Sequence, residues 1–224
     1  MEQVTSAEYA VFQKAYNFFN TELFGGELPG VLITLQRKSH NVGMYRQGSF
    51  KDRKNQAEVD EIAINPDAYV NLPDMEIWQA LVHEMCHQWQ FHFGKPSRKS
   101  YHNKEWANKM LEVGLIPSST GKPGGSKVGQ TMYDYVDEAG KFIQCTRELR
   151  KLGIVVQLES SSTEGLVSRS AEALEQEARL RQAGVKKNRS NRVKYSCPSC
   201  FMNVWGKPDL HIVCGGCQQR LESV

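Results

Sequence analysis

The sequence predicts an α+β fold in which helices pack on a small sheet and a small zinc-binding module follows. Three observations support this prediction. Residues 6–20 and 74–93 carry apolar side chains at the spacing of one helical face, and short β-branched runs lie between them. Residues 195–224 hold two Cys-x-x-Cys pairs. A chain of 224 residues is long enough for one core and a smaller module.

The elements of the expected core follow one another along the first half of the chain. Ser6 is a suitable N-cap for the first helix, and the Gly and Pro residues within 25–30 end it. Asp74 is the expected N-cap of the long second helix, which stops at Gly94. The predicted elements are, in chain order, a helix at 6–20, strands at 31–35, 43–50 and 61–64, and helices at 74–93 and 102–113.

Beyond this core the composition shifts towards Ser, Gly and charged residues. Residues 142–149 fit either a strand or a helix, residues 153–158 fit a strand, and residues 171–183 fit a polar helix. We therefore predict four parts: a core at 1–116, an extension of uncertain structure at 117–158, a polar basic linker at 159–194 and a four-cysteine module at 195–224.

Residues 83–87 read His-Glu-Met-Cys-His, which is the H-E-x-x-H pattern, and they lie inside the best-defined helix. Positions four apart share a helical face, so His83 and His87 can ligate one Zn²⁺ while Glu84 reaches the metal-bound water. Zinc lowers the pKa of that water to about 7, and a carboxylate can take its proton and pass it to a leaving amine. The motif indicates a zinc peptidase centre; the alternative is a chance match on a core helix.

A catalytic zinc needs a third protein ligand and an open position for water. His102 is the predicted third ligand, because a Gly-Lys-Pro break ahead of it lets the chain turn back over the site. His92 follows His87 by five residues, which directs it away from the metal on a continuing helix, and it fits a surface or capping histidine. Tyr101 is either an oxyanion donor or a packing residue. Cys86 fits a small buried hydrophobe.

Four cysteines form a second group with the spacing C-x2-C-x13-C-x2-C: Cys197, Cys200, Cys214 and Cys217. Each Cys-x-x-Cys forms a tight turn that offers two thiolates to a tetrahedral ion. A closed shell of four sulfurs leaves no room for water, so we expect a structural zinc that holds together a unit too small to fold alone. Redox or disulfide use of these cysteines is the alternative.

Basic residues gather just before the cysteines, although the net charge of +3 is too small to indicate a partner by itself. Beside a zinc ribbon such a run suits contact with phosphate backbones. Tyr195, Phe201 and Trp205 follow it and are candidates to stack on bases. A solvated linker beside ribbon core residues is the alternative. The basic run consists of Arg179, Arg181, Lys186, Lys187, Arg189, Arg192 and Lys194.

The composition excludes several classes of protein. With 40% hydrophobic and 24% charged residues, the chain is neither wholly disordered nor fibrous. No apolar run approaches the roughly 18 residues that a membrane span needs. The first residues lack the basic and apolar regions of a signal peptide. We therefore expect a cytoplasmic protein without a membrane partner.

Together these residues resemble the SprT-like family of zinc metallopeptidases, whose eukaryotic member Spartan degrades proteins crosslinked to DNA. Besides the H-E-x-x-H, the resemblance rests on residues 16–20, on residues 61–66 and on His102 with Trp106 four positions later. Bacterial members similarly end in a four-cysteine ribbon. The resemblance implies a zincin-like metallopeptidase domain, with helices packed on a small sheet, at residues 1–116.

By this resemblance His83, His87 and His102 would bind the catalytic zinc and Glu84 would act as the base, in agreement with the motif chemistry. Asn103 departs from the family pattern, in which a glycine commonly follows the third histidine. The family fold also implies an edge strand, expected at 61–64, that could receive an extended substrate by strand addition.

The sequence thus predicts a zinc metalloendopeptidase with one catalytic and one structural zinc. The resemblance adds DNA-associated or DNA-crosslinked proteins as substrates, with DNA held by the basic linker and the ribbon. The main alternative is a nucleic-acid-binding accessory factor whose helix zinc site is structural or weakly active. A metal-dependent hydrolase of a non-peptide bond is a further alternative, because the motif chemistry is shared.

Overall fold

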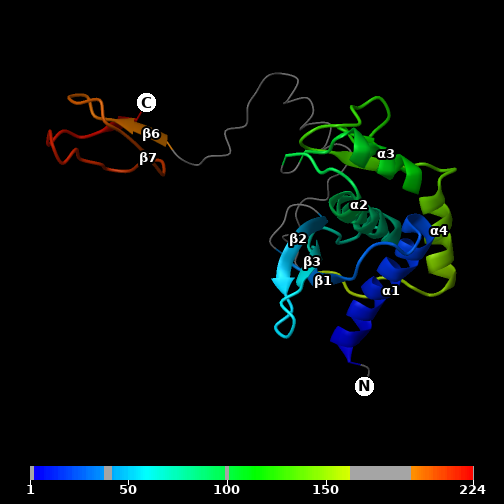
Figure 1. The fold of residues 1–224 in the computed structure, drawn as a ribbon. Coiled ribbons are helices and arrows are strands. Elements are labelled where there is room, and N and C mark those ends of the chain that lie inside the picture. Colours follow the sequence, from blue (N-terminus) through cyan, green and yellow to red (C-terminus); the bar gives the residue numbers. More distant parts are fainter. Residues whose placement is uncertain (1–2, 38–41, 99–100, 162–192, 224) are drawn as a thin grey trace. The chain divides into compact units, whose positions relative to one another are not determined.

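The computed structural model describes residues 3–37, 42–98, 101–161 and 193–223 (Figure 1). The chain divides into two compact units, residues 1–175 and 176–224, which we describe separately. The basic run from Arg179 to Arg192 and the predicted polar helix at 171–183 lie outside the described residues. Within the described residues, no helix is both long and apolar enough to cross a membrane.

The first unit mixes helices and strands, which confirms the predicted mixed class. Helices and strands occur at the expected places up to residue 113, with boundaries that differ by a few residues. Its elements are α1 (Val4–Phe24), β1 (Val31–Leu35), β2 (Gly43–Lys51), β3 (Glu58–Ile64), α2 (Asp74–Phe93), α3 (Lys104–Val113), β4 (Leu115–Ser118), β5 (Tyr133–Val136) and α4 (Lys141–Lys151).

The three-stranded sheet has the order β1-β3-β2, with β1 parallel and β2 antiparallel to β3. Strand β3 is therefore the central strand, and the prediction that residues 61–64 form an edge is wrong. The reason is that Ile62 pairs on one side with Ile33 and on the other with Tyr45, so its backbone groups are already used. The edges are β1 and β2.

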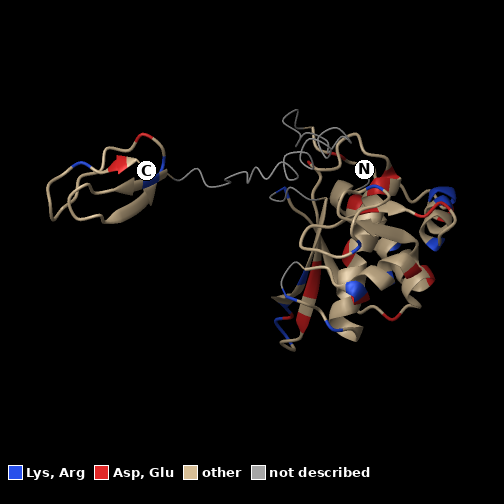
Figure 2. Cartoon of the chain, turned by 90° about the horizontal axis from the view of Figure 1, so that it is seen from above, with Lys and Arg blue, Asp and Glu red and all other residues tan. Residues whose placement is uncertain are grey.

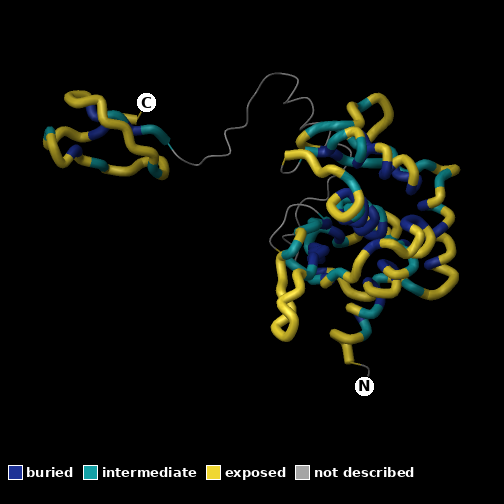
Figure 3. Tube along the Cα trace, in the orientation of Figure 1, coloured by how far each residue is buried: buried dark blue, intermediate teal, exposed yellow. Residues whose placement is uncertain are grey.

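The core lies between the helices and one face of the sheet, where the buried parts of the trace gather (Figure 3). Phe12 of α1 packs edge-on against Trp78 of α2, with ring centroids 5.6 Å apart. Phe19 stacks on Phe142, which brings α4 against α1. These fully buried side chains give the unit an apolar core of its own.

Residues 115–158 form part of the first unit, because side chains such as Phe142 and Leu149 belong to its core. Strands β4 and β5 pair antiparallel, and residues 142–149 form the amphipathic helix α4. The predicted strand at 153–158 is wrong, because this segment pairs with no strand. Side chains satisfy its backbone instead: the Tyr69 hydroxyl donates to the carbonyl of Leu158 at 3.0 Å.

The second unit is a small sheet of order β7-β6-β8 around the four cysteines. Its core is small, with Tyr195, Cys197, Cys214 and Leu221 buried. Its strands are β6 (Val193–Ser196), β7 (Asn203–Gly206) and β8 (Glu222–Ser223).

Candidate metal centres

Helix α2 presents two histidines of the H-E-x-x-H motif one turn apart on one face. Asp74 is the first residue of this helix rather than its cap, a position that Pro73 takes. The structure brings His102 to the same place, so that ligand atoms of His83, His87 and His102 all lie within 4.8 Å of one another.

His102 reaches the centre from the segment just before α3. Its backbone forms a two-way bridge with Gly129, with N···O distances of 2.8 and 3.0 Å. Asn103 caps α3 by accepting the amide hydrogen of Trp106 at 3.1 Å, and its side chain also accepts from Gln90 at 2.7 Å. Asn103 therefore has a local role in fixing the helix that follows His102.

The three histidines suit a zinc ion. Nε2 of His87 lies 3.1 Å from Nε2 of His102, and two nitrogens held by one tetrahedral zinc are about 3.3 Å apart. Nδ1 of His83 faces Asp134 at 2.8 Å and Nδ1 of His102 faces the carbonyl of Gly129 at 3.2 Å. In both residues this leaves Nε2 as the nitrogen available to a metal.

The electrostatics favour neutral imidazole, the form that ligates metals, at two of the three positions. Burial and then the charges of the neighbouring histidines lower the pKa of His87 well below its usual range. Burial and His83 lower the pKa of His102 to about 4. Burial also acts to lower the pKa of His83, but the hydrogen bond and charge of Asp134 outweigh it and raise that pKa.

Glu84 lies beside the triad and is held by the sheet. Its Oε2 accepts the backbone N–H of Tyr45 at 2.7 Å, so strand β2 anchors the carboxylate. Burial raises the pKa of Glu84, against the opposing effects of His83 and of this amide. Gly43 makes the approach of the strand feasible: a Cβ at that position would stand 2.8 Å from Cγ of Glu84.

Trp106 packs against all three histidines and is fully buried. Its ring centroid lies 4.9 Å from that of His83, 5.2 Å from that of His87 and 4.4 Å from that of His102. Rings wedged in this way have few rotamers available, so the indole keeps the imidazoles in place before a metal arrives.

The other residues singled out in the sequence lie away from the triad. His92 has its Nε2 2.6 Å from Oδ2 of Asp60, with its side chain 30% exposed, and is not part of the triad. The guanidinium of Arg98 lies over the ring of Tyr101 at 4.9 Å, a packing contact. Cys86 is fully buried, and burial raises the pKa of its thiol well above the usual range, as expected of a packing residue.

Sequence reasoning missed three groups that support this centre: Asp134, Gly43 and the carbonyl of Gly129. Asp134 comes 51 positions after His83, on a strand that was not predicted. No spacing rule connects such distant positions. A weak signal was present for Gly43, because a glycine at the start of a predicted strand marks a close backbone approach.

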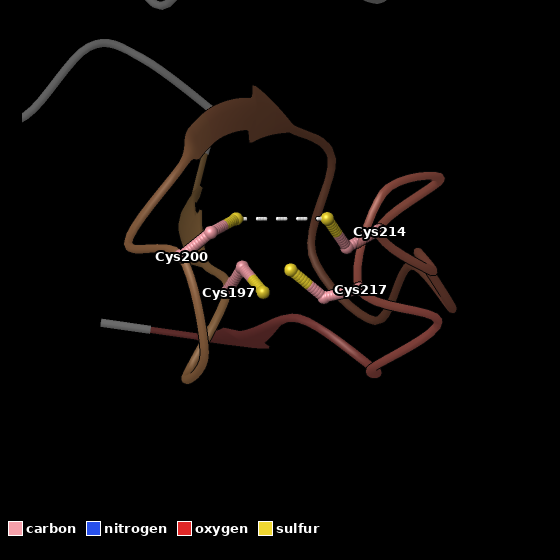
Figure 4. Close-up of side chains that lie close together, drawn as sticks. All are labelled: Cys197, Cys200, Cys214 and Cys217. Atoms are coloured by element: carbon pink, nitrogen blue, oxygen red, sulfur yellow. Dashed lines mark hydrogen bonds between the residues drawn. The ribbon is translucent and has the colours of Figure 1, made fainter.

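The second centre is the group of four cysteines in the C-terminal unit (Figure 4). Their sulfur atoms lie within 4.8 Å of one another, and Sγ of Cys200 is 3.7 Å from Sγ of Cys214. All four are free cysteines. The backbone amides of Cys217 and Gly216 lower the pKa of Cys214 to about 7, which favours a thiolate there. Against the backbone amide of Met202, hydrogen bonds with the other three thiols raise the pKa of Cys200 to about 12.

Matching turns hold the two cysteine pairs. After the first pair, the amide of Phe201 donates to the carbonyl of Cys197; after the second, the amide of Gln218 donates to the carbonyl of Cys214. Phe201 and Gln218 both adopt positive φ, 58° and 54°. Because the two turns have the same geometry, they bring all four sulfur atoms close together. The cluster, like the histidine triad, is therefore able to bind zinc.

Comparison with known proteins agrees with this geometry. Residues 12–123, half of the 224 residues, match the SprT-like family. A Salmonella typhimurium protein described as an uncharacterized protein in the mucB 3' region is 45% identical over 58 residues, which cover 26% of this chain and 78% of that protein. No solved structure matches the chain significantly. The mixed helix and sheet unit fits a zincin-like domain, and the chain belongs to the SprT-like family.

Proposed function

We propose that this chain is a zinc metallopeptidase that hydrolyses peptide bonds in DNA-associated proteins. One observation carries the hydrolytic part: the carboxylate of Glu84, held by the amide of Tyr45, lies beside three histidines that converge on one point. A purely structural zinc site needs no carboxylate fixed next to its ligands.

Each residue of the centre has a role in this proposal. His83, His87 and His102 hold the metal and leave one coordination position open. When bound, zinc lowers the pKa of a water molecule and polarises the substrate carbonyl. Glu84 uses Oε2 for the amide of Tyr45, which leaves Oε1 to take the proton of the attacking water. Its raised pKa suits the later transfer of that proton to the leaving amine.

Strand β2 is the proposed docking site for an extended substrate. It is an edge of the sheet, whereas residues 61–64 are not, and the Tyr45 contact ties it to the general base. A peptide that pairs with this edge is presented next to the open metal position. Phe91 lies one turn after His87 on α2, 37% exposed and in contact with the ring of Tyr45. These two rings offer an apolar surface to a substrate side chain.

The C-terminal unit is the proposed nucleic-acid contact, a zinc ribbon held by a structural ion. Phe201 and Trp205 are 74% and 60% exposed, which suits stacking on unpaired bases. Tyr195 does not belong to this platform: it is buried, and its hydroxyl donates to the carbonyl of Lys207 at 2.7 Å. Few charges lie on the described part of this unit (Figure 2), so phosphate contacts are assigned to the basic run before it.

The first experiment compares wild type with Glu84→Gln. We expect the wild type to cleave a DNA-binding protein, faster with single-stranded DNA, and the variant to cleave it about 10²- to 10⁴-fold more slowly. Both should retain two zinc ions per chain by mass spectrometry. Glutamine keeps an acceptor for the amide of Tyr45 but cannot take a proton. Full zinc occupancy without cleavage by the wild type under any condition would support the accessory-factor function instead.

The DNA part has a separate test in the full chain. Phe201→Ala with Trp205→Ala is expected to weaken single-stranded DNA binding without changing basal cleavage. Tyr9→Ala, a 37% exposed aromatic residue of α1, is the matched control for loss of surface apolar area. Equal DNA affinity of the double variant and wild type would refute the stacking platform and leave the peptidase proposal intact.

A further inference from the structure

A segment beyond the family match reaches back to the histidine triad. Asp134 of β5 places its carboxylate against His83, and Gly129 places its carbonyl against His102. Both follow residue 123, where the match to the family ends. We propose that Asp134 is a positioning residue that fixes the tautomer and orientation of His83 for metal binding, an inference that rests on the proposed metal site.

The geometry of the contact determines which ring nitrogen faces the metal. Nδ1 of His83 lies 2.8 Å from Oδ2 of Asp134, and the two side chains are only 14% and 7% exposed. A carboxylate only accepts hydrogen bonds, so Nδ1 must carry the hydrogen. In the neutral ring Nε2 is then bare and is the nitrogen left for a metal. Without Asp134 the ring would exchange tautomers and rotate, and the metal would have to select one state from several.

A second residue holds Asp134 in turn. Nε2 of Gln79 donates to Oδ1 of Asp134 at 2.6 Å and to its backbone carbonyl at 3.0 Å. Gln79 precedes His83 by one helical turn, so Gln79 lies on the same face of α2 as the two histidines of the motif. The amide fixes one carboxylate oxygen and thereby aims the other at His83.

Asp134→Asn is a sharp test, because the two side chains have almost the same shape and differ only in their hydrogen-bonding groups. The asparagine amide cannot satisfy both neighbours. If its oxygen accepts from Gln79, its NH₂ group faces Nδ1 of His83 and forces the hydrogen onto Nε2, which then cannot ligate. If its oxygen faces His83, its NH₂ group opposes that of Gln79. We expect zinc affinity at the triad to fall about 10- to 100-fold.

The double variant Gln79→Met with Asp134→Asn separates positioning from packing. Methionine has a similar volume and no donor, so the asparagine oxygen is free to turn towards His83. We expect the double variant to bind zinc more tightly than Asp134→Asn alone. If Asp134 acted only through packing, the second substitution would weaken binding further or leave it unchanged.

Zinc affinity is measured in the full chain by chelator competition. The His87→Ala variant gives the zinc-binding curve of the cysteine cluster alone, because its histidine triad is incomplete. Glu138→Gln, an exposed carboxylate in the same segment, is the matched control and should bind as wild type does. NMR of the metal-free wild type, recorded at a pH at which the His83 ring is neutral, should show its hydrogen on Nδ1. That spectrum also decides the matter if Asp134→Asn fails to fold: a neutral ring with its hydrogen on Nε2 would overturn the inference.

The outcomes distinguish this inference from the proposed function. If His87→Ala binds as much zinc as wild type, the triad is not a metal site and the proposed function fails. If wild type binds zinc at the triad and Asp134→Asn matches its affinity, only the positioning role fails. If Asp134→Asn is weaker and the double variant recovers, both stand.

Discussion

The two metal centres are built in opposite ways. The four cysteines come from two short turns with the same hydrogen-bond pattern, and almost everything that aims them lies within the next few residues. The histidine centre draws on α2, β2, β5 and the segment before α3, and its supporting groups lie up to 51 positions away along the chain. A closed structural site needs only local geometry, whereas an open site with a base depends on the surrounding fold.

Zinc removal should produce the largest difference between the two units. The C-terminal unit has a small core, so a chelator should unfold it, and Cys197→Ser should do the same. The first unit should keep its fold because its apolar core exists without metal. Hydrogen exchange should show rapid exchange in β6 and β7 and continued protection in α1 and α2.

Ser199→Ala, an exposed substitution in the same turn as Cys197, should leave exchange in the C-terminal unit unchanged. Simultaneous loss of protection in α2 would contradict the comparison, because the first unit would then depend on its metal as well.

The second prediction concerns the base that only the histidine centre has. Glu84→Gln should lower the rate of peptide hydrolysis by about 10²- to 10⁴-fold, the usual contribution of general acid–base catalysis. Zinc content should not change, because Glu84 is not among the converging ligand residues. Rate and zinc content are measured on the same preparation. Parallel loss of zinc would mean that Glu84 supports the site rather than the reaction.

The third prediction tests the dependence of that base on the sheet. Gly43→Ala places a Cβ 2.8 Å from Cγ of Glu84, so either β2 or the carboxylate must move. A displacement of this kind costs about 10²-fold in rate when a reacting group loses its position. Zinc affinity should stay unchanged.

Gly30→Ala is the matched control, because no atom lies within 4 Å of a Cβ added there and its backbone is not in the left-handed region. A rate for Gly43→Ala equal to that of this control would show that β2 does not position Glu84.

The same contrast explains what could be predicted from the sequence. Ligand spacing is local for the cysteines and for His83 and His87, and the helix that carries the motif is strongly periodic, so these groups were predicted. Asp134 and the carbonyl of Gly129 were not, because a single hydrogen-bonding group on a distant strand leaves no periodic signal. The edge strand was misassigned because a buried apolar run reads alike at an edge and in the centre of a sheet.

The smallest expected effect lies on the surface of the cysteine unit. Phe201 is 74% exposed, so its side chain adds little to the core of the cysteine unit. Phe201→Ala should therefore change the free energy of unfolding by no more than about 0.5 kcal/mol relative to wild type. Its affinity for single-stranded DNA should fall about tenfold, as expected for loss of one stacking ring. Fluorescence anisotropy with a labelled oligonucleotide measures the affinity, and urea titration measures the stability. A loss of stability with unchanged DNA affinity would assign Phe201 to the fold of the unit rather than to a partner.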